Sequence, residues 1–154
     1  MLLRLIFIFL LVPGTLAACS GESDARSEPN GQITRPGDVG LPLDNPEAVA
    51  AFDVADRFLL RWFFLQDIDR ALEFVHADSR ETWQPLLEET GIKRSCMLLQ
   101  VEGSTPDAAG VVMARYAIGG CKVTTPDELA AEFIELTMTS GAEGPLVTQI
   151  EFLR

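Results

Sequence analysis

Cys19 is the residue whose chemistry the sequence indicates most clearly, because it follows a short leader built like a secretory signal. Arg4 supplies a positive charge near the amino terminus, and an unbroken apolar run covers residues 5–12. Residues 13–15 interrupt the run before the small residues that precede the cysteine. The run is far shorter than the roughly 20 residues that a membrane-spanning helix needs. Residues 1–18 are therefore predicted to be a cleaved signal peptide.

The residues Leu16-Ala17-Ala18-Cys19 resemble the lipobox of bacterial lipoproteins, which combines an aliphatic residue, two small residues and an invariant cysteine. The resemblance implies that the thiol of Cys19 is diacylglycerylated, that the signal is cut just before it, and that the new amino terminus is acylated. Two or more acyl chains give lasting membrane attachment, whereas one chain gives only marginal binding. The same residues also fit an ordinary signal peptide, in which Cys19 becomes a free or paired thiol.

The resemblance also implies a place in the cell envelope. Ser20 follows the cysteine, and in enterobacterial lipoproteins a residue other than Asp here lets the protein be sorted to the outer membrane. We therefore expect a lipid-anchored envelope protein, on the periplasmic face of the outer membrane if the host has two membranes.

The chain is strongly acidic, and this limits its partners. It contains 23 acidic and 12 basic residues and has a formal net charge of −11 at pH 7. Nucleic acid is excluded as a partner, because its recognition needs a basic footprint. An anionic membrane surface would repel such a chain, so the acyl groups of Cys19 are expected to hold the domain at the membrane, clear of the headgroups.

Residues 19–45 are expected to be the lipidated cysteine and a disordered linker. This segment is rich in Gly, Ser, Pro, Asp and Glu, and it cannot bury enough apolar surface to offset its ordering entropy. As a flexible coil, the 26 residues after Cys19 span on the order of 28 Å. The folded domain is predicted to occupy residues 46–154.

Helical periodicity dominates the first half of this domain. A long helix is predicted over residues 46–66, with a wide apolar face and with Asp53 and Arg57 spaced for an i,i+4 ion pair. A short second helix follows. A third helix is predicted to open at a capping box over residues 78–81 and to run to about Glu89.

The apolar pattern changes to a period of two after the helices. It predicts four strands, over residues 96–101, 111–118, 130–139 and 146–153. A hairpin turn is expected at residues 141–144, and a bulge is expected where Phe133 and Ile134 are both apolar. The fold class is predicted to be α+β, with N-terminal helices packed on one face of a curved antiparallel sheet that forms a cone-like roll.

The residues from Phe58 to Val75 resemble the opening of nuclear transport factor two-like proteins. There, a first helix ends in an aromatic-rich turn, a polar break follows, and a second helix carries paired Ala and Leu. The closing hairpin over residues 131–152 is also similar to the last two strands of such domains. Gln66 departs from the pattern, because the family often has Gly at this point. The resemblance covers nearly all of residues 46–154 and implies a cone that encloses a pocket; a cystatin-like or other α+β roll is the alternative.

The resemblance also implies where catalytic groups would lie. Enzymes of this superfamily, the ketosteroid isomerase and polyketide cyclase-like members, place an acid, His or Tyr inside the cone. The strand positions expected to point inward carry no carboxylate and no histidine: Val112, Ala114, Tyr116, Ile118, Ile134, Leu136, Met138, Leu146, Thr148, Ile150 and Phe152. This pattern argues against catalysis.

Two weak catalytic candidates remain. His76, the only histidine, is placed to act as an acid and base with Asp78 or Asp67 at the cone mouth, or to cap the C-terminus of the second helix. Tyr116 is placed to donate a hydrogen bond to a ligand or to pack in the core. The candidate ligand-binding residues have core packing as their alternative: Trp62, Phe63, Tyr116 and Met138.

The remaining cysteines, Cys96 and Cys121, each lie near the end of a predicted strand. In an exported domain the oxidising compartment favours a disulfide between them, and two buried thiols are the alternative. One histidine and two scattered cysteines do not make a zinc site, so neither a metal nor a cofactor is expected.

Two functions follow as hypotheses. In the first, an accessory lipoprotein binds a small apolar ligand or an envelope protein partner without catalysis. In the second, an isomerase- or dehydratase-type enzyme uses His76 or Tyr116. The orientation of His76, and whether any carboxylate enters the interior, should distinguish the two.

Overall fold

A computed structural model describes residues 32–35, 40–92, 96–125, 127 and 130–154 of the chain. The predicted signal peptide, Cys19 and the first part of the linker lie outside the described residues. None of the described helices is long and apolar enough to cross a membrane.

The helices come first in the domain. Helix α1 (Pro46–Leu59) continues directly into a π-helical turn, η1 (Leu60–Phe64). The side chain of Asn45 caps α1 by accepting hydrogen bonds from the backbone N–H groups of Glu47 and Ala48, at 3.0 and 2.9 Å. Three shorter elements complete the helical half: α2 (Ile68–Leu72), the 3₁₀ turn η2 (Ala77–Ser79) and α3 (Arg80–Glu89).

The strands form one main sheet in the order β1-β2-β3-β6-β7. Its strands are β1 (Gln32–Thr34), β2 (Met97–Gly103), β3 (Val111–Gly119), β6 (Phe133–Gly141) and β7 (Gly144–Leu153). All neighbouring pairs are antiparallel except β1 and β2, which are parallel. Two short strands, β4 (Val123–Thr124) and β5 (Ala130–Ala131), pair separately beside the main sheet. The α+β fold class is therefore confirmed.

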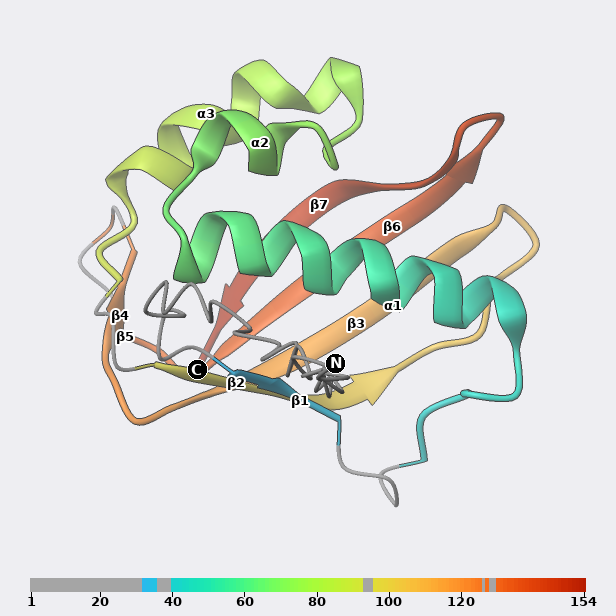
Figure 1. Ribbon diagram of the computed structural model, residues 1–154, viewed down its shortest axis with the longest axis horizontal. Coiled ribbons are helices and arrows are strands. Elements are labelled where there is room, and N and C mark those ends of the chain that lie inside the picture. The colour runs from blue at the N-terminus through green and yellow to red at the C-terminus, as the bar shows by residue number, and fades with distance from the viewer. Residues whose placement is uncertain (1–31, 36–39, 93–95, 126, 128–129) are drawn as a thin grey trace, which may run out of the picture.

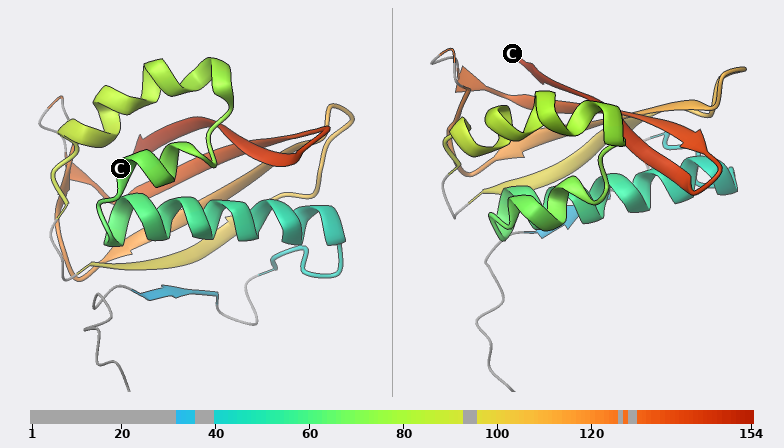
Figure 2. Two further views of the ribbon diagram at one scale, coloured as in Figure 1. Left: turned by 45° about the horizontal axis from the view of Figure 1, so that its top comes forward. Right: turned by 90° about the horizontal axis from the view of Figure 1, so that it is seen from above.

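The core lies between the helices and one face of the sheet. Figure 1 shows α1 lying across β3, β6 and β7, and Figure 2 shows α2 and α3 on the same side of the sheet. The aromatic residues Phe52, Phe58 and Trp62 are at most 1% exposed there. Helix and sheet are in direct contact at Gly103, where an added Cβ would lie 2.5 Å from the Phe52 ring. A larger residue than glycine would force these layers apart.

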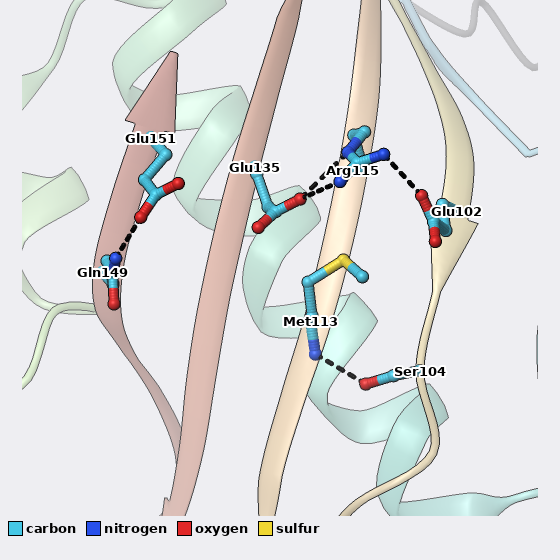
Figure 3. Close-up of polar contacts among 7 residues, drawn as sticks. All are labelled: Glu102, Ser104, Met113, Arg115, Glu135, Gln149 and Glu151. Carbon is cyan, nitrogen blue, oxygen red and sulfur yellow. Dashed lines mark hydrogen bonds and ion pairs between the residues drawn. The ribbon is translucent and has the colours of Figure 1, made fainter. Parts of the chain in front are cut away.

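The other face of the sheet is open and carries polar side chains. Arg115 on β3 reaches Glu102 at 2.7 Å and Glu135 on β6 at 2.6 Å, so one guanidinium links three strands (Figure 3). Gln149 donates a hydrogen bond to Glu151 farther along this face. Cross-strand ion pairs of this kind each add a few tenths of a kcal/mol to about 1 kcal/mol at an exposed face.

The linker prediction is wrong for residues 32–35. Gln32, Ile33 and Thr34 pair with Met97, Leu98 and Leu99 of β2 and extend the sheet by one strand. Composition pointed to disorder because a polar segment buries little apolar surface on its own. Here an existing sheet edge supplies the missing partner.

The long helix predicted over residues 46–66 is present as α1 and η1, which together end at Phe64. Its geometry changes to π-helical at Leu60, and the left-handed residue Gln66, with φ of +53°, follows its end. The expected capping box is wrong: Ser79 is the N-cap of α3 but makes no capping hydrogen bond with its side chain, because the 3₁₀ turn η2 precedes the helix directly.

The bulge lies elsewhere than expected. Phe133 and Ile134 pair regularly with β7, whereas the β6–β7 register shifts between Thr137 and Met138. Because the extra residue reverses the alternation of β7, Val147 points into the core, in place of Leu146 and Thr148. The predicted turn at residues 141–144 is confirmed by the pairing of Gly141 with Gly144.

Candidate functional site

A polar cluster around Asp56 is the most unusual feature of the interior. Its carboxylate accepts a hydrogen bond from the hydroxyl of Tyr116 at 2.8 Å through Oδ1. Its Oδ2 accepts a second from Nη2 of Arg35 at 2.6 Å. The same Arg35 nitrogen lies 3.3 Å from Asp53 Oδ1. Three elements meet here: the helix α1, the strand β3 and the residue that follows β1.

Helical spacing places Asp56 on the buried side of α1. It lies four residues after Phe52 and three before Leu59, and both of these are fully buried. Tyr116 points inward from β3 and is also fully buried. Arg35 comes from the amino-terminal side of the sheet, and its guanidinium carbon lies 6.0 Å from the centre of the Phe52 ring.

Gln100 extends the cluster on β2. It is the cross-strand partner of Tyr116, so the two side chains share the inner face. Gln100 is fully buried, and neither its amide nitrogen nor its amide oxygen has a hydrogen-bond partner among the described residues. Nε of Arg35 is buried without a partner as well. Arg35 and Gln100 are each the residue that follows the last β1–β2 pair, Thr34 and Leu99.

Burial changes the acidity of this cluster. It raises the pKa of Asp56 above its usual 3.8, while the hydrogen bond from Tyr116 and the charge of Arg35 act in the opposite direction. Burial, together with the neighbouring Asp56 carboxylate, raises the pKa of Tyr116 well above 10. Tyr116 therefore remains a protonated donor, and Asp56 holds a proton more readily than an exposed aspartate.

Asp56 is also accessible from a pocket at the surface of the domain. It lines a pocket of about 220 Å³ between α1, η1 and β1, together with Ile33, Arg57, Leu60 and Phe64. A carboxyl group with a raised pKa beside an apolar surface can in principle exchange a proton with a bound molecule. Both of its oxygens are already bound to Tyr116 and Arg35, however, and this is the arrangement of a structural contact.

The residues expected to line a ligand pocket instead fill the core. Tyr116 and Met138 are fully buried, and Trp62 and Phe63 are 1% and 2% exposed. Trp62 donates a hydrogen bond from its indole nitrogen to the carbonyl of Leu87 at 3.1 Å, which ties η1 to α3. All four side chains belong to the hydrophobic core, and Trp62 also lines a pocket of about 200 Å³ between η1 and α3.

His76 lies away from this interior. It follows α2 and forms the N-cap of η2, and its Nδ1 accepts a 3.4 Å hydrogen bond from the backbone of Asp78. Its side chain is 47% exposed and lies 3.8 Å from the Asp78 carboxylate. It lines a surface pocket of about 410 Å³ together with residues of the β6–β7 hairpin. The expected C-terminal cap of α2 is therefore wrong, because the chain turns into η2 at this residue.

The largest of these pockets lies at the end of the sheet where β7 finishes. It has a volume of about 450 Å³ and brings together residues of α3, β5, the β4–β5 loop and the end of β7. Leu86, Ala131, Phe152 and Leu153 supply its apolar walls, and Glu89, Asp127 and Arg154 are its charged residues. Its size is within the range of small-molecule sites.

The cysteines occupy separate parts of the chain. Cys96 and Cys121 are joined by a disulfide, with their Cα atoms 4.9 Å apart. Cys19 lies outside the described residues. Within the described ranges, no group of three or more His, Cys, Asp or Glu side chains is placed to hold a metal ion.

Sequence reasoning missed Asp56, Arg35 and Gln100. A signal for Asp56 was present, since it is an acidic residue within the stripe formed by Phe52, Leu59 and Phe63. The positions expected to point into the interior were all on strands, and Asp56 lies on a helix. Arg35 and Gln100 carry no comparable signal, because their position depends on the long-range pairing of β1 with β2.

Comparison with known proteins gives little beyond this geometry. No protein-family model matches the chain, and a search of curated proteins gave no match. Among solved structures, the chain is similar to a "putative aromatic ring hydroxylase" from Novosphingobium aromaticivorans, with 14% sequence identity and a TM-score of 0.46. The match covers 70% of this chain and 90% of that protein.

Proposed function

We propose that this protein is an envelope lipoprotein, anchored through acylated Cys19, whose domain is a nuclear transport factor two-like roll. In this proposal the domain binds a small apolar ligand or an envelope protein partner and catalyses no reaction. The lipobox and leader support the anchor. The arrangement of helices on one face of a curved sheet supports the roll.

A filled interior is the observation that carries the non-catalytic part of the proposal. Trp62, Phe63, Tyr116 and Met138 are at most 2% exposed and pack in the hydrophobic core. The partly buried carboxylate, Asp56, is bound on both oxygens. His76 is half-exposed at the surface, and its neighbouring carboxylate, Asp78, is exposed as well. The pocket that reaches Asp56 lies at the edge of the domain, outside this core, and a substrate there would meet a carboxylate whose oxygens are already bound.

The anchor is tested by replacing its thiol. Cys19→Ser should release the protein from the membrane fraction of cells, while the parent protein stays in that fraction. Mass spectrometry of the parent's amino terminus should find acylated Cys19 as the first residue. Unchanged retention of Cys19→Ser in membranes would refute the anchor.

The ligand is expected at the 450 Å³ pocket, where Leu86 and Phe152 offer an apolar surface beside charged residues. An apolar fluorescent dye should bind the parent protein and bind Leu86→Glu at least about tenfold more weakly, because the charge would be placed in the apolar wall. Leu99→Glu, on the open face of β2, is the matched control and should bind like the parent. Equal binding by all three proteins would contradict this site and favour a protein partner.

An isomerase- or dehydratase-type activity is the second candidate, and the contact between Asp56 and Tyr116 favours it. A carboxyl group with a raised pKa and a buried phenol donor are groups that proton transfer beside a carbonyl needs. This candidate predicts exchange of an α-proton of a ketone with solvent deuterium. The exchange should disappear in Asp56→Asn. Absence of exchange by the parent protein would exclude the candidate.

A further inference from the structure

One exposed edge of the domain combines apolar and basic side chains. We call it the α1 edge and define it by Ile33, Arg57, Leu60, Arg61 and Phe64. Leu60 is 40% exposed although it is a large apolar residue. With Ile33 and Phe64 it borders the 220 Å³ pocket, whose exposed lining is almost entirely apolar. Such a patch on a monomer usually marks an interaction site.

The basic residues of the α1 edge are not used within the domain. Arg57 was expected to pair with Asp53, but Asp53 lies beside Arg35 instead. Among the described residues neither Arg57 nor Arg61 forms an ion pair, while the neighbouring acids Asp53 and Asp56 are both bound to Arg35. The edge therefore presents two arginines that form no ion pair among the described residues, although the chain as a whole is acidic.

The α1 edge also lies where the chain from the anchor enters the domain. Described structure begins at Gln32, directly before Ile33, and β1 begins at the end of the sheet where α1 finishes (Figure 1). Twelve residues separate Cys19 from Gln32. Even fully extended, they reach no more than about 40 Å. The linker of 26 residues first expected would reach about 94 Å when fully extended, so the shorter segment keeps this edge nearer the proposed anchor.

These observations together favour one binding partner for the α1 edge. We propose that the α1 edge lies on the surface of a lipid bilayer that contains anionic headgroups. This inference rests on the proposed acylation of Cys19. Leu60, Phe64 and Ile33 enter the interfacial region, and the arginines extend to lipid phosphates on either side. The net acidic charge keeps the rest of the domain away from the bilayer, so one edge faces it and the orientation is fixed.

The test uses the full acylated protein in vesicles of phosphatidylethanolamine and phosphatidylglycerol. An environment-sensitive fluorophore is attached at Leu60→Cys, and the matched control carries it at Met97→Cys. Met97 is 53% exposed and lies on the open face of β2. With Cys19 acylated and Cys96 bonded to Cys121, the new thiol is the reactive one. A quencher in the lipid should quench the label at residue 60 at least about twofold more strongly than the label at residue 97.

Each outcome decides one part of the proposal. Equal, weak quenching at both positions in protein that still floats with the vesicles overturns the membrane contact and leaves the anchor standing. Protein that does not float with vesicles refutes the anchor itself. A spectral shift at residue 60 without vesicles, growing with protein concentration or on addition of an apolar dye, assigns the edge to a second copy or a small molecule and overturns the proposal.

A charge variant provides the second arm. Arg57→Glu leaves the core intact, since Arg57 is exposed and unpaired among the described residues. It should lower the quenching at residue 60 in vesicles with phosphatidylglycerol and change little in vesicles without it. Unchanged quenching in both kinds of vesicle would contradict the role of the anionic headgroups.

Discussion

Asp56 combines two opposing effects at one carboxyl group. Burial disfavours its charge, while Tyr116 and Arg35 favour it, and the net result is a pKa raised above 3.8. A raised pKa means that the folded protein binds this proton more tightly than the unfolded chain does. Between pH 3.8 and the raised pKa, the unfolded state binds fewer protons, so the contribution of Asp56 to stability falls as pH rises.

We therefore predict a pH-dependent difference between the parent protein and Asp56→Asn. The free energy of unfolding of the parent, minus that of the variant, should decrease as pH rises through this window, by at most about 1.4 kcal/mol per pH unit. Denaturant unfolding at a series of pH values measures this difference. A difference that increases with pH would mean that Arg35 and Tyr116 outweigh burial.

Gln66 is a second residue at which the backbone imposes a cost. Its φ of +53° lies in the left-handed region, which a residue with a side chain adopts less readily than glycine. A glycine would adopt this backbone conformation without that cost. Gln66→Gly should raise the free energy of unfolding by about 0.5–1 kcal/mol. The control Gln84→Gly, on an exposed face of α3, should lower it by about 1 kcal/mol.

At the scale of elements, β1 depends on a side-chain contact as much as on its own pairing. Only three residues pair with β2, and Arg35 then reaches over to α1 at Asp56. So short a strand is marginal without further contacts. The ion pair therefore holds β1 against the sheet edge. In this position β1 covers backbone groups of β2 that would otherwise be open to pairing with another chain.

Removing this side chain should loosen β1. Arg35→Ala is expected to lower the free energy of unfolding by about 1–3 kcal/mol, because it leaves a partly buried carboxylate with one partner fewer. Hydrogen exchange at the backbone amides of Leu98 and Leu99 should accelerate with it. Arg70→Ala removes an exposed pair with Asp67 at 3.7 Å and should change stability by less than about 0.5 kcal/mol. Equal effects of the two substitutions would contradict the role of Arg35.

The same elements explain what sequence patterns could predict. Local periodicity predicted the helices, the main strands and the turn at residues 141–144, because each depends on neighbours in the chain. It failed for β1, whose partner lies more than sixty residues away, and for β7, where a bulge reverses the alternation. The Asp56 cluster depends on both long-range pairing and helix phase. The cluster is formed by three segments that lie far apart in the sequence, and this is the physical reason that it was not predicted.

At the scale of the whole molecule, the two faces of the sheet have different roles. The inner face packs against the helices and is filled, while the outer face carries the Arg115 ion pairs across three strands (Figure 3). The pockets therefore open at the margins of the domain, at the end of β7 and along α1. Sequence patterns predicted the layers correctly but assigned binding to the interior, because apolar residues that fill a core and those that line a cavity have the same spacing.

The disulfide joins the ends of two neighbouring strands of the main sheet. Cys96 precedes β2 and Cys121 follows β3, so the bond closes the pair of strands on which β1 depends, across a sequence separation of 25 residues. In the chain-entropy account such a loop contributes about 3 kcal/mol by restricting the unfolded chain. Replacing both cysteines by serine should lower the free energy of unfolding by about that amount, measured by denaturant unfolding of the acylated protein in detergent. Membrane fractionation should stay unchanged, because Cys19 lies outside the bonded pair. Loss of membrane retention in this variant would mean that the folded domain, and not the acyl group alone, holds the protein at the membrane.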